Sequence, residues 1–174
     1  MKKSSSFHEI QTQKQWWTWA ILIATAGFMV FGCYRQVVMG ITFGDNPASN
    51  TWLIIVTALV VLVIVAMLLL KLDTFIDKNG VYVRFLPFQR NYKFYDWKSV
   101  ASYEVRKYNP ALEYGGWGYR YRSGKKIAYS MNGRIGLQLT FIDGKIVMIG
   151  TQKQEEMLHF LNQLKEESGI KTIE

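Results

Sequence analysis

Two long apolar runs dominate the first third of the chain. They cover residues 16–34 and 52–70, and the second ends abruptly at Lys71. At about 1.5 Å per residue, roughly 19 helical residues span about 28 Å, close to the hydrocarbon thickness of a bilayer. The pattern therefore predicts a transmembrane hairpin over 16–71, with helices at about 16–38 and 52–70.

The end of the first helix is left open by the sequence. Apolar character resumes at Val37-Val38-Met39, so the helix ends either near Tyr34 or near Phe43. In the longer case Arg35 reaches the headgroups by snorkelling, and this is the favoured interpretation. A functional intramembrane Arg35 is the alternative, although neither run offers an acidic partner. Gly44-Asp45-Asn46-Pro47 predicts the break between the helices.

The hairpin carries no acidic residue, histidine or lysine inside either run. It is therefore interpreted as an anchor and not as a transport path. Small residues of the first run predict close packing against the second run; they are Ala20, Ala24, Ala26 and Gly27. Asn50 or Thr51 is predicted to cap the second helix. Cys33 is the only cysteine, so no intrachain disulfide can form, and a buried or lipid-facing thiol is expected.

Cationic residues flank the hairpin and set its expected orientation. Lys2, Lys3 and Lys14 precede the first run, and Lys71 and Lys78 follow the second. By the positive-inside rule, both termini lie in the cytoplasm. Residues 1–15 are accordingly predicted to form a cytoplasmic tail.

After Lys71 the apolar period changes to two, which is typical of strands. The predicted strands cover 72–76, 81–85, 91–94, 100–107, 119–122, 127–131, 135–142 and 145–149. Asn79-Gly80 is a hairpin signal, because both turn positions then need positive φ. Pro87 ends the second strand, and Asp96-Trp97-Lys98 predicts a turn or a single helical turn.

One amphipathic helix is predicted at about 152–168. Thr151 with Gln154 forms a capping box, and Gly169 ends the helix. Its apolar stripe has the i, i+3, i+4, i+7 spacing and comprises Met157, Phe160, Leu161 and Leu164. Residues 72–174 therefore predict an α+β domain: an antiparallel β-barrel or sandwich of about seven strands, capped by one C-terminal helix.

The formal charge of +8 is concentrated between Arg84 and Arg134, where eleven Lys or Arg residues face three acidic residues. Beside a membrane anchor, such a block favours contact with anionic lipid. The candidate lipid-contact residues are Lys71, Lys78, Arg84, Arg90, Lys93, Lys125 and Lys126. Nucleic acid is the other usual partner of a basic block, and the membrane anchor makes it the less favoured one.

The most unusual local sequence is a glycine-rich loop around Trp117. Three glycines let the backbone adopt positive φ or approach another group closely. One interpretation is a β-bulge with Trp117 packed in the core. The other is a binding loop, whose candidate residues are Arg106, Tyr108, Glu113, Tyr114, Gly115, Gly116, Trp117, Gly118 and Arg120. No helix or Gly-Lys-Ser follows, so this is not a phosphate-binding P-loop.

The sequence offers no catalytic or cofactor motif. His8 and His159 lack Cys or carboxylate partners at metal-ligand spacing, and no nucleophile–base pair or dinucleotide fingerprint is present. We therefore expect a protein that is not an enzyme and that needs no metal or cofactor.

Several segments carry a family resemblance over nearly the whole chain. They are Trp97-Lys98-Ser99-Val100, Gly150-Thr151-Gln152, Tyr103 to Pro110 and Glu113 to Gly118. Together with the helical hairpin, they resemble the bacterial pleckstrin-homology-like (PH-like) membrane proteins, in particular a subgroup with an N-terminal two-helix hairpin. The resemblance implies a PH-like fold and a place in the bacterial inner membrane, but no particular activity. Tyr82 stands where inositide-binding relatives carry a second cation, so specific inositide binding is not expected.

Three functions remain open from the sequence. The first is a non-catalytic, membrane-anchored binding or scaffolding module for a protein partner or a second copy of the chain. The second is a sensor or binder of anionic lipid through the basic face. The third is an accessory subunit of a membrane complex.

Overall fold

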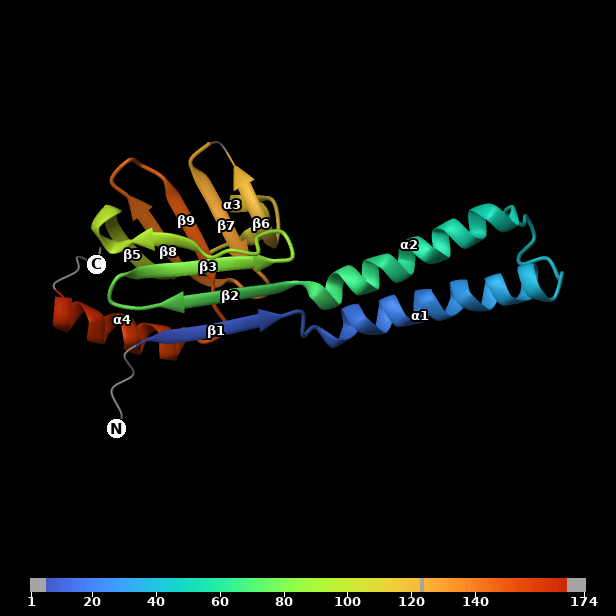
Figure 1. Cartoon of the computed structure of the whole chain (residues 1–174), viewed down its shortest axis with the longest axis horizontal. Coiled ribbons are helices and arrows are strands. Elements are labelled where there is room, and N and C mark those ends of the chain that lie inside the picture. The colour runs from blue at the N-terminus through green and yellow to red at the C-terminus, as the bar shows by residue number, and fades with distance from the viewer. Residues whose placement is uncertain (1–5, 123, 169–174) are drawn as a thin grey trace. The chain divides into compact units, whose positions relative to one another are not determined.

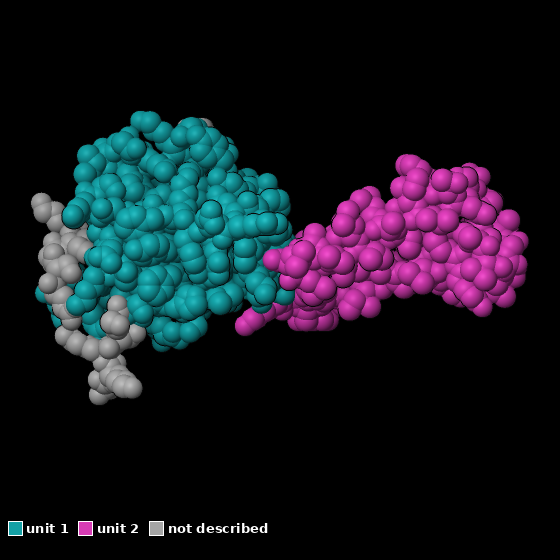
Figure 2. Space-filling model, in the orientation of Figure 1, with its two compact units in different colours: residues 1–13, 70–174 teal, residues 14–69 magenta. Residues whose placement is uncertain are grey.

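The structure is a computed structural model that describes residues 6–122 and 124–168. Contacts divide the chain into two compact units (Figure 2). Unit 1 comprises Met1–Gln13 and Leu70–Glu174, and unit 2 comprises Lys14–Leu69. The expectations for Lys2, Lys3 and Gly169 lie outside the described residues.

Unit 2 is a pair of helices. The first, α1 (Trp16–Cys33), continues directly into a π-helical turn, η1 (Tyr34–Val38), and the second is α2 (Asn50–Leu69). Both are long and apolar enough to cross a membrane. The first helix thus ends at Val38, between the two ends that the sequence left open, and places Arg35 in its last turn, with its guanidinium 6.0 Å from the Phe31 ring centroid.

The two helices contact each other through a different set of residues from the one predicted. The Cys33 thiol lies 3.1 Å from the Thr57 hydroxyl, and Leu53 is buried. Gly32 is the buried glycine of α1, because a Cβ there would lie 2.7 Å from the Phe43 ring. Of the four small residues predicted to pack, Ala20, Ala24 and Gly27 are exposed and Ala26 is half-buried.

The cap of α2 also differs from the prediction. Ser49 Oγ accepts a hydrogen bond from the Trp52 N–H at 3.3 Å, so Ser49 caps the helix in place of Asn50 or Thr51.

The outward faces of unit 2 are apolar and unprotected. Large side chains that are at least 40% exposed include Ile21, Ile23, Phe28, Val30, Phe31, Ile54, Ile55, Leu59, Val61, Leu62, Val63, Val65, Leu68 and Leu69. A soluble monomer rarely exposes a continuous apolar patch of this kind. The faces are therefore suited to apolar surroundings.

Unit 1 contains two sheets (Figure 1). The first is antiparallel and has the order β1 (Phe7–Thr12), β2 (Lys71–Ile76), β3 (Gly80–Leu86), β4 (Lys93–Asp96). The second has the order β5 (Val100–Lys107), β8 (Ile135–Phe141), β9 (Ile146–Gly150), β7 (Lys126–Ser130), β6 (Gly118–Arg122). The helices are η2 (Trp97–Ser99, 3₁₀), α3 (Pro110–Tyr114) and α4 (Gln154–Ser168).

The α+β class with a C-terminal helix is confirmed. Of the two predicted arrangements, barrel or sandwich, the barrel is absent: the described strands form two separate sheets, since β4 and β5 pair in different sheets. The predicted all-antiparallel pairing is wrong at one place: β9 is antiparallel to β8 but parallel to β7. A period of two identifies strands but says nothing about which strand a distant one joins.

The predicted N-terminal tail contains an edge strand. β1 pairs with β2 from Phe7↔Ile76 to Thr12↔Lys71. Its inward positions include Glu9 and Gln11, both polar and both buried, so its sequence lacks the apolar alternation of a strand. β1, which precedes the helical hairpin in the sequence, therefore belongs to the same sheet as β2, which follows the hairpin.

Polar contacts from β1 organise the start of α4. The Glu9 carboxylate accepts from the Thr151 hydroxyl at 2.6 Å and from the Gln152 N–H at 2.8 Å. Thr151 Oγ1 in turn accepts from the Lys153 N–H at 3.0 Å. The side chain that accepts hydrogen bonds before this helix thus comes from β1 and not from the predicted capping-box partner Gln154, and its negative charge suits the positive end of the helix.

Replacing Glu9 by Ala is expected to lower the free energy of unfolding by about 2 kcal/mol, because the buried Thr151 hydroxyl and the part-buried Gln152 N–H lose their acceptor. Thermal unfolding of the full chain in detergent measures the loss. Glu156→Ala is the matched control, since the exposed Glu156–Lys153 pair is worth little. Equal losses in the two variants would contradict the role of Glu9.

The turn between β2 and β3 is held by Asp77. Its carboxylate accepts from the N–H groups of Asn79 (2.8 Å) and Gly80 (3.0 Å). The predicted hairpin is present, but Gly80 is not among the positive-φ glycines. Gly80 is instead required by space, because a Cβ there would overlap the Tyr95 carbonyl oxygen on β4.

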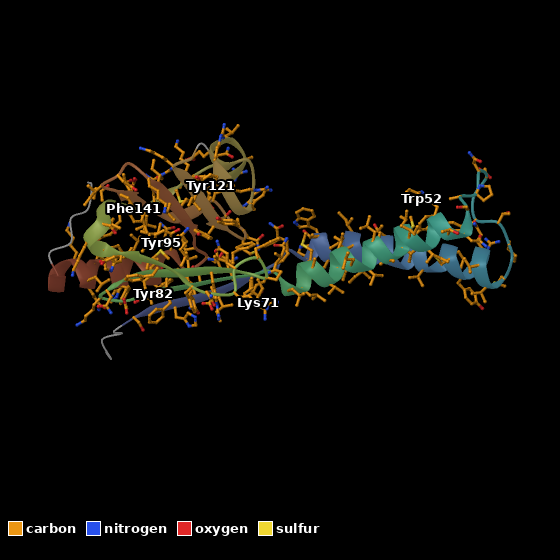
Figure 3. The ribbon with its side chains drawn as sticks, turned by 45° about the horizontal axis from the view of Figure 1, so that its top comes forward. Trp52, Lys71, Tyr82, Tyr95, Tyr121 and Phe141 are labelled. Atoms are coloured by element: carbon orange, nitrogen blue, oxygen red, sulfur yellow. The ribbon has the colours of Figure 1, made fainter. Side chains whose placement is uncertain are left out.

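The main core lies between the sheets and under α4. The predicted stripe of α4 is buried in it, with Met157 fully enclosed. Tyr95 and Tyr129, from different sheets, place their hydroxyls 3.1 Å apart in this core. Tyr82 lies on the opposite face of its sheet from Tyr95 (Figure 3).

Candidate functional site

The glycine-rich loop begins as a short capped helix. Asn109 Oδ1 accepts from the N–H groups of Ala111 (3.1 Å) and Leu112 (3.3 Å), and Pro110 supplies the first turn. Gly115, at φ 77°, ends α3 in the left-handed conformation. The predicted β-bulge with Trp117 in the core is therefore wrong: the turn is a helix end, and Trp117 is 45% exposed.

α3 covers the face of the second sheet that points away from the main core. Ala128 and Met148 lie under it with Tyr108 and Tyr114, whereas their strand neighbours Ile127, Val147 and Ile149 belong to the main core. The Tyr108 and Tyr114 rings meet edge to face at 6.0 Å. This second small core fixes α3 on the sheet.

A cavity of about 500 Å³ opens beside α3, and we call it the cationic pocket. Its lining residues are Arg106, Leu112, Glu113, Tyr114, Arg122, Lys126, Gln138 and Ile146. Three cations therefore face one carboxylate. Long-range register assembles the set, since Arg122 pairs with Lys126, which pairs with Ile146.

The three cations differ in how far they are engaged. Arg106 pairs with Glu113 at 2.5 Å, and its hydrogen bonds lower the pKa of the Glu113 carboxyl. Arg122 donates to the Leu112 carbonyl oxygen at 2.7 Å, at the end of α3. Lys126 is exposed, and its charge also lowers the pKa of the Glu113 carboxyl, although it forms no ion pair or hydrogen bond within the described part of the chain. Two of the cations thus form no ion pair with a carboxylate.

A second cavity, of about 330 Å³, is lined mainly by apolar groups, and we call it the apolar pocket. Its lining residues are Leu70, Phe85, Phe88, Trp117, Gly118, Tyr119 and Arg120. The Trp117 indole N–H donates to the Gly133 carbonyl oxygen at 3.0 Å. Arg120 Nε donates to the Trp117 carbonyl oxygen at 3.0 Å. The ring and the guanidinium are therefore both held in place at the pocket.

The residues predicted as one binding loop fall into two places. Arg106, Glu113 and Tyr114 line the cationic pocket. Trp117, Gly118 and Arg120 line the apolar pocket. The other three line neither cavity: Tyr108 is buried under α3, and Gly115 and Gly116 connect α3 to β6.

The remaining pocket residues were not predicted as part of the loop. Gln138 and Phe88 lie on segments distant in sequence, and Arg122 was seen only as part of the basic block. Only the register of strand pairing shows that these residues lie at the pockets.

The predicted lipid-contact cations are dispersed over unit 1. Lys71 begins β2, Lys78 lies in the turn after it, Arg84 binds Asp73, and Lys125 donates to the Asp143 carbonyl oxygen. Arg90 and Lys93 are exposed around β4, and Lys126 lines the cationic pocket.

A buried ionic cluster was not anticipated. The Asp73 side chain is 3% exposed and accepts from His8 (2.9 Å), Arg84 (2.8 Å to Nη2) and Tyr92 (2.6 Å). His8 and Asp73 lie 65 residues apart in the sequence, but strand pairing brings them together. Burial raises the pKa of Asp73, and the hydrogen bonds from Tyr92, His8 and Arg84 outweigh this and lower it. The cluster ties three strands together.

Among residues 6–122 and 124–168, no group of three or more His, Cys, Asp or Glu is arranged to hold a metal ion. The two pockets are therefore the candidate binding sites of unit 1. Comparison of the sequence with protein-family models and with curated proteins finds no match in either, so these sites are interpreted from their own geometry.

Proposed function

We propose that this protein is a non-catalytic binding module of the bacterial inner membrane. In this proposal α1 and α2 span the bilayer, and a PH-like domain on the cytoplasmic side binds a protein partner. The observation that carries the proposal is the exposed apolar surface of unit 2, joined to a domain with an open cationic pocket. Two sheets followed by a C-terminal helix support the PH-like assignment, and the lysines around the hairpin support the orientation.

The cationic pocket favours an acidic segment as the bound part of the partner. Among the described residues, Arg122 donates only to backbone carbonyl oxygens and Lys126 forms no ion pair, so both offer positive charge to a ligand. Electrostatic complementarity of this kind sets partner choice and association rate.

The neighbouring strand supplies a backbone template for the same partner. β6 is the last strand of its sheet, so one side of its backbone is available for strand addition. Arg122 lies on this strand and also lines the pocket, so an added acidic strand would reach Lys126. If the partner is itself a membrane protein, this chain is an accessory subunit of its complex.

A photo-crosslinking residue at position 112 tests the proposal in membranes of cells that express the full chain. Leu112 lines the pocket and is 75% exposed, and Ile142, at 73%, is the matched control position. We expect a defined protein adduct from position 112, resistant to carbonate extraction, and little from position 142. Lys126→Glu should reduce its yield about tenfold, through a charge reversal worth roughly 1.4 kcal/mol, whereas Lys98→Glu should not.

Two outcomes would contradict the proposal. One is release of the chain from the membrane by carbonate. The other is an equal yield of protein adducts from the two positions. An adduct to a second copy of the chain would identify the partner as the protein itself.

A further inference from the structure

The apolar pocket is distinct from the cationic pocket and has its own chemistry. Phe85, Phe88, Trp117 and Tyr119 give it an aromatic wall, and no acidic residue lines it. Phe88 is 72% exposed and Trp117 is 45% exposed, and both line the open cavity. Exposed aromatic side chains around a hollow commonly mark an interaction site.

Hydrogen bonds of the loop hold two of the side chains that line this pocket. The Trp117 indole is fixed by its bond to Gly133, and Arg120 is fixed by its bond to the Trp117 carbonyl. Gly116, at φ 121°, lies against the same guanidinium, where a Cβ would be 3.4 Å from Arg120 Nη2. The tryptophan therefore has its polar atom satisfied and presents an apolar ring, with a guanidinium at the rim.

Chain connectivity indicates what the pocket meets. Leu70 lines the pocket and directly follows Leu69, the last residue of the apolar helix α2. Consecutive Cα atoms lie about 3.8 Å apart. If α2 spans a bilayer, the surface of that bilayer lies within one or two residues of Leu70. The next residue, Lys71, is exposed and adds a second cation at this point (Figure 3).

We propose that the apolar pocket binds an acyl chain of an anionic phospholipid. The acyl chain lies against Phe88 and Trp117. Arg120 and Lys71 contact the phosphate of the lipid headgroup. Aromatic rings are favoured at the level of the headgroups, and cations there attract anionic lipid. The inference rests on the membrane location in the proposed function but not on the protein partner, which uses the other pocket.

The test is photo-crosslinking of the purified full chain in vesicles that contain equal parts of phosphatidylglycerol and phosphatidylcholine. A benzophenone side chain replaces Phe88 in one sample and Ile142 in the other, since both positions are exposed to the same extent. Mass spectrometry identifies lipid adducts. We expect roughly ten times more phospholipid adduct from position 88, the ratio that burial of a large apolar side chain corresponds to. The adducts should be enriched in phosphatidylglycerol.

The charge contribution is tested with Arg120→Gln and Lys71→Gln together, which should abolish the enrichment in phosphatidylglycerol. Equal lipid adducts from positions 88 and 142 would overturn the proposal. So would protein adducts alone from position 88, or adducts without preference for phosphatidylglycerol in the unsubstituted background. Carbonate extraction of the same chain from cells tests membrane insertion separately. Release by carbonate would contradict the proposed membrane location, whereas the outcomes above concern the apolar pocket alone.

Discussion

The Asp73→Asn protein is expected to unfold about 10 °C below the wild-type protein. Asn keeps the shape of Asp73 but turns an N–H₂ group toward donors from Arg84, Tyr92 and His8. Breaking a buried ion pair costs about 3–5 kcal/mol, and the lower end applies because the Arg84 side chain is 32% exposed. A loss of about 3 kcal/mol corresponds to this shift in a domain of about 100 residues or more.

Asp143→Asn is the matched control for this substitution. Asp143 accepts one backbone hydrogen bond, from Lys145 in an exposed turn, and an amide oxygen can accept it equally well. Its effect should stay within about 0.5 kcal/mol. A similar loss of stability in both variants would show that the cluster around Asp73 contributes nothing special.

The pH dependence follows from the lowered pKa of Asp73. The unfolded chain then binds a proton more readily than the folded one, so the contribution of Asp73 to stability is complete above its ordinary value of 3.8. It is lost as the pH falls through the lower, folded pKa. The difference in melting temperature between wild type and Asp73→Asn should therefore be constant near neutral pH and shrink below about pH 3.8.

Gly80→Ala is expected to destabilise unit 1 by about 3 kcal/mol, at the upper end of the usual cost of overpacking. The new methyl group would overlap the Tyr95 carbonyl oxygen, and a backbone atom cannot turn aside as a side chain can. We expect β4 to separate from β3. Thermal unfolding and the near-ultraviolet circular dichroism of the buried Tyr95 and Trp97 measure the change.

Gly133→Ala separates lack of space from backbone strain. Gly133 has φ 87°, and nothing lies within 4 Å of a Cβ built on it. Its substitution should cost only the roughly 1 kcal/mol of a left-handed backbone position. If Gly133→Ala destabilised the protein as much as Gly80→Ala, the close approach of β4 would not be the reason for a glycine at position 80.

Elements with a strong local period were predictable from the sequence. The apolar stripe of α4, the alternation in β3 and the uninterrupted apolar run of α2 each repeat a single preference over several turns or residue pairs. β1 was missed because its inward positions are Glu9 and Gln11, which are buried only through contacts with Thr151, Gln152 and Gly150. Such contacts, made across more than 130 residues, leave no local trace in a sequence.

The same limit applies to the candidate sites. Three neighbouring glycines around Trp117 drew attention to the right segment, because their composition is locally unusual. The sequence could not show that Gly115 ends a helix while Arg120 and Trp117 turn toward Phe88. Nor could it separate the two pockets, since Lys126 and Gln138 reach the first of them only through the order of strands in the second sheet.

The pairing of Thr12 with Lys71 imposes an order on the folding of this protein during its synthesis. The ribosome makes β1 first and β2 only after both apolar helices, 59 residues later by this register. At about 5–20 residues per second, β1 waits some 3–12 s for its partner. The first sheet can therefore close only after the helical hairpin has left the ribosome. A delay in releasing or inserting the hairpin would keep the backbone of β1 and the facing edge of β2 unpaired for the same time.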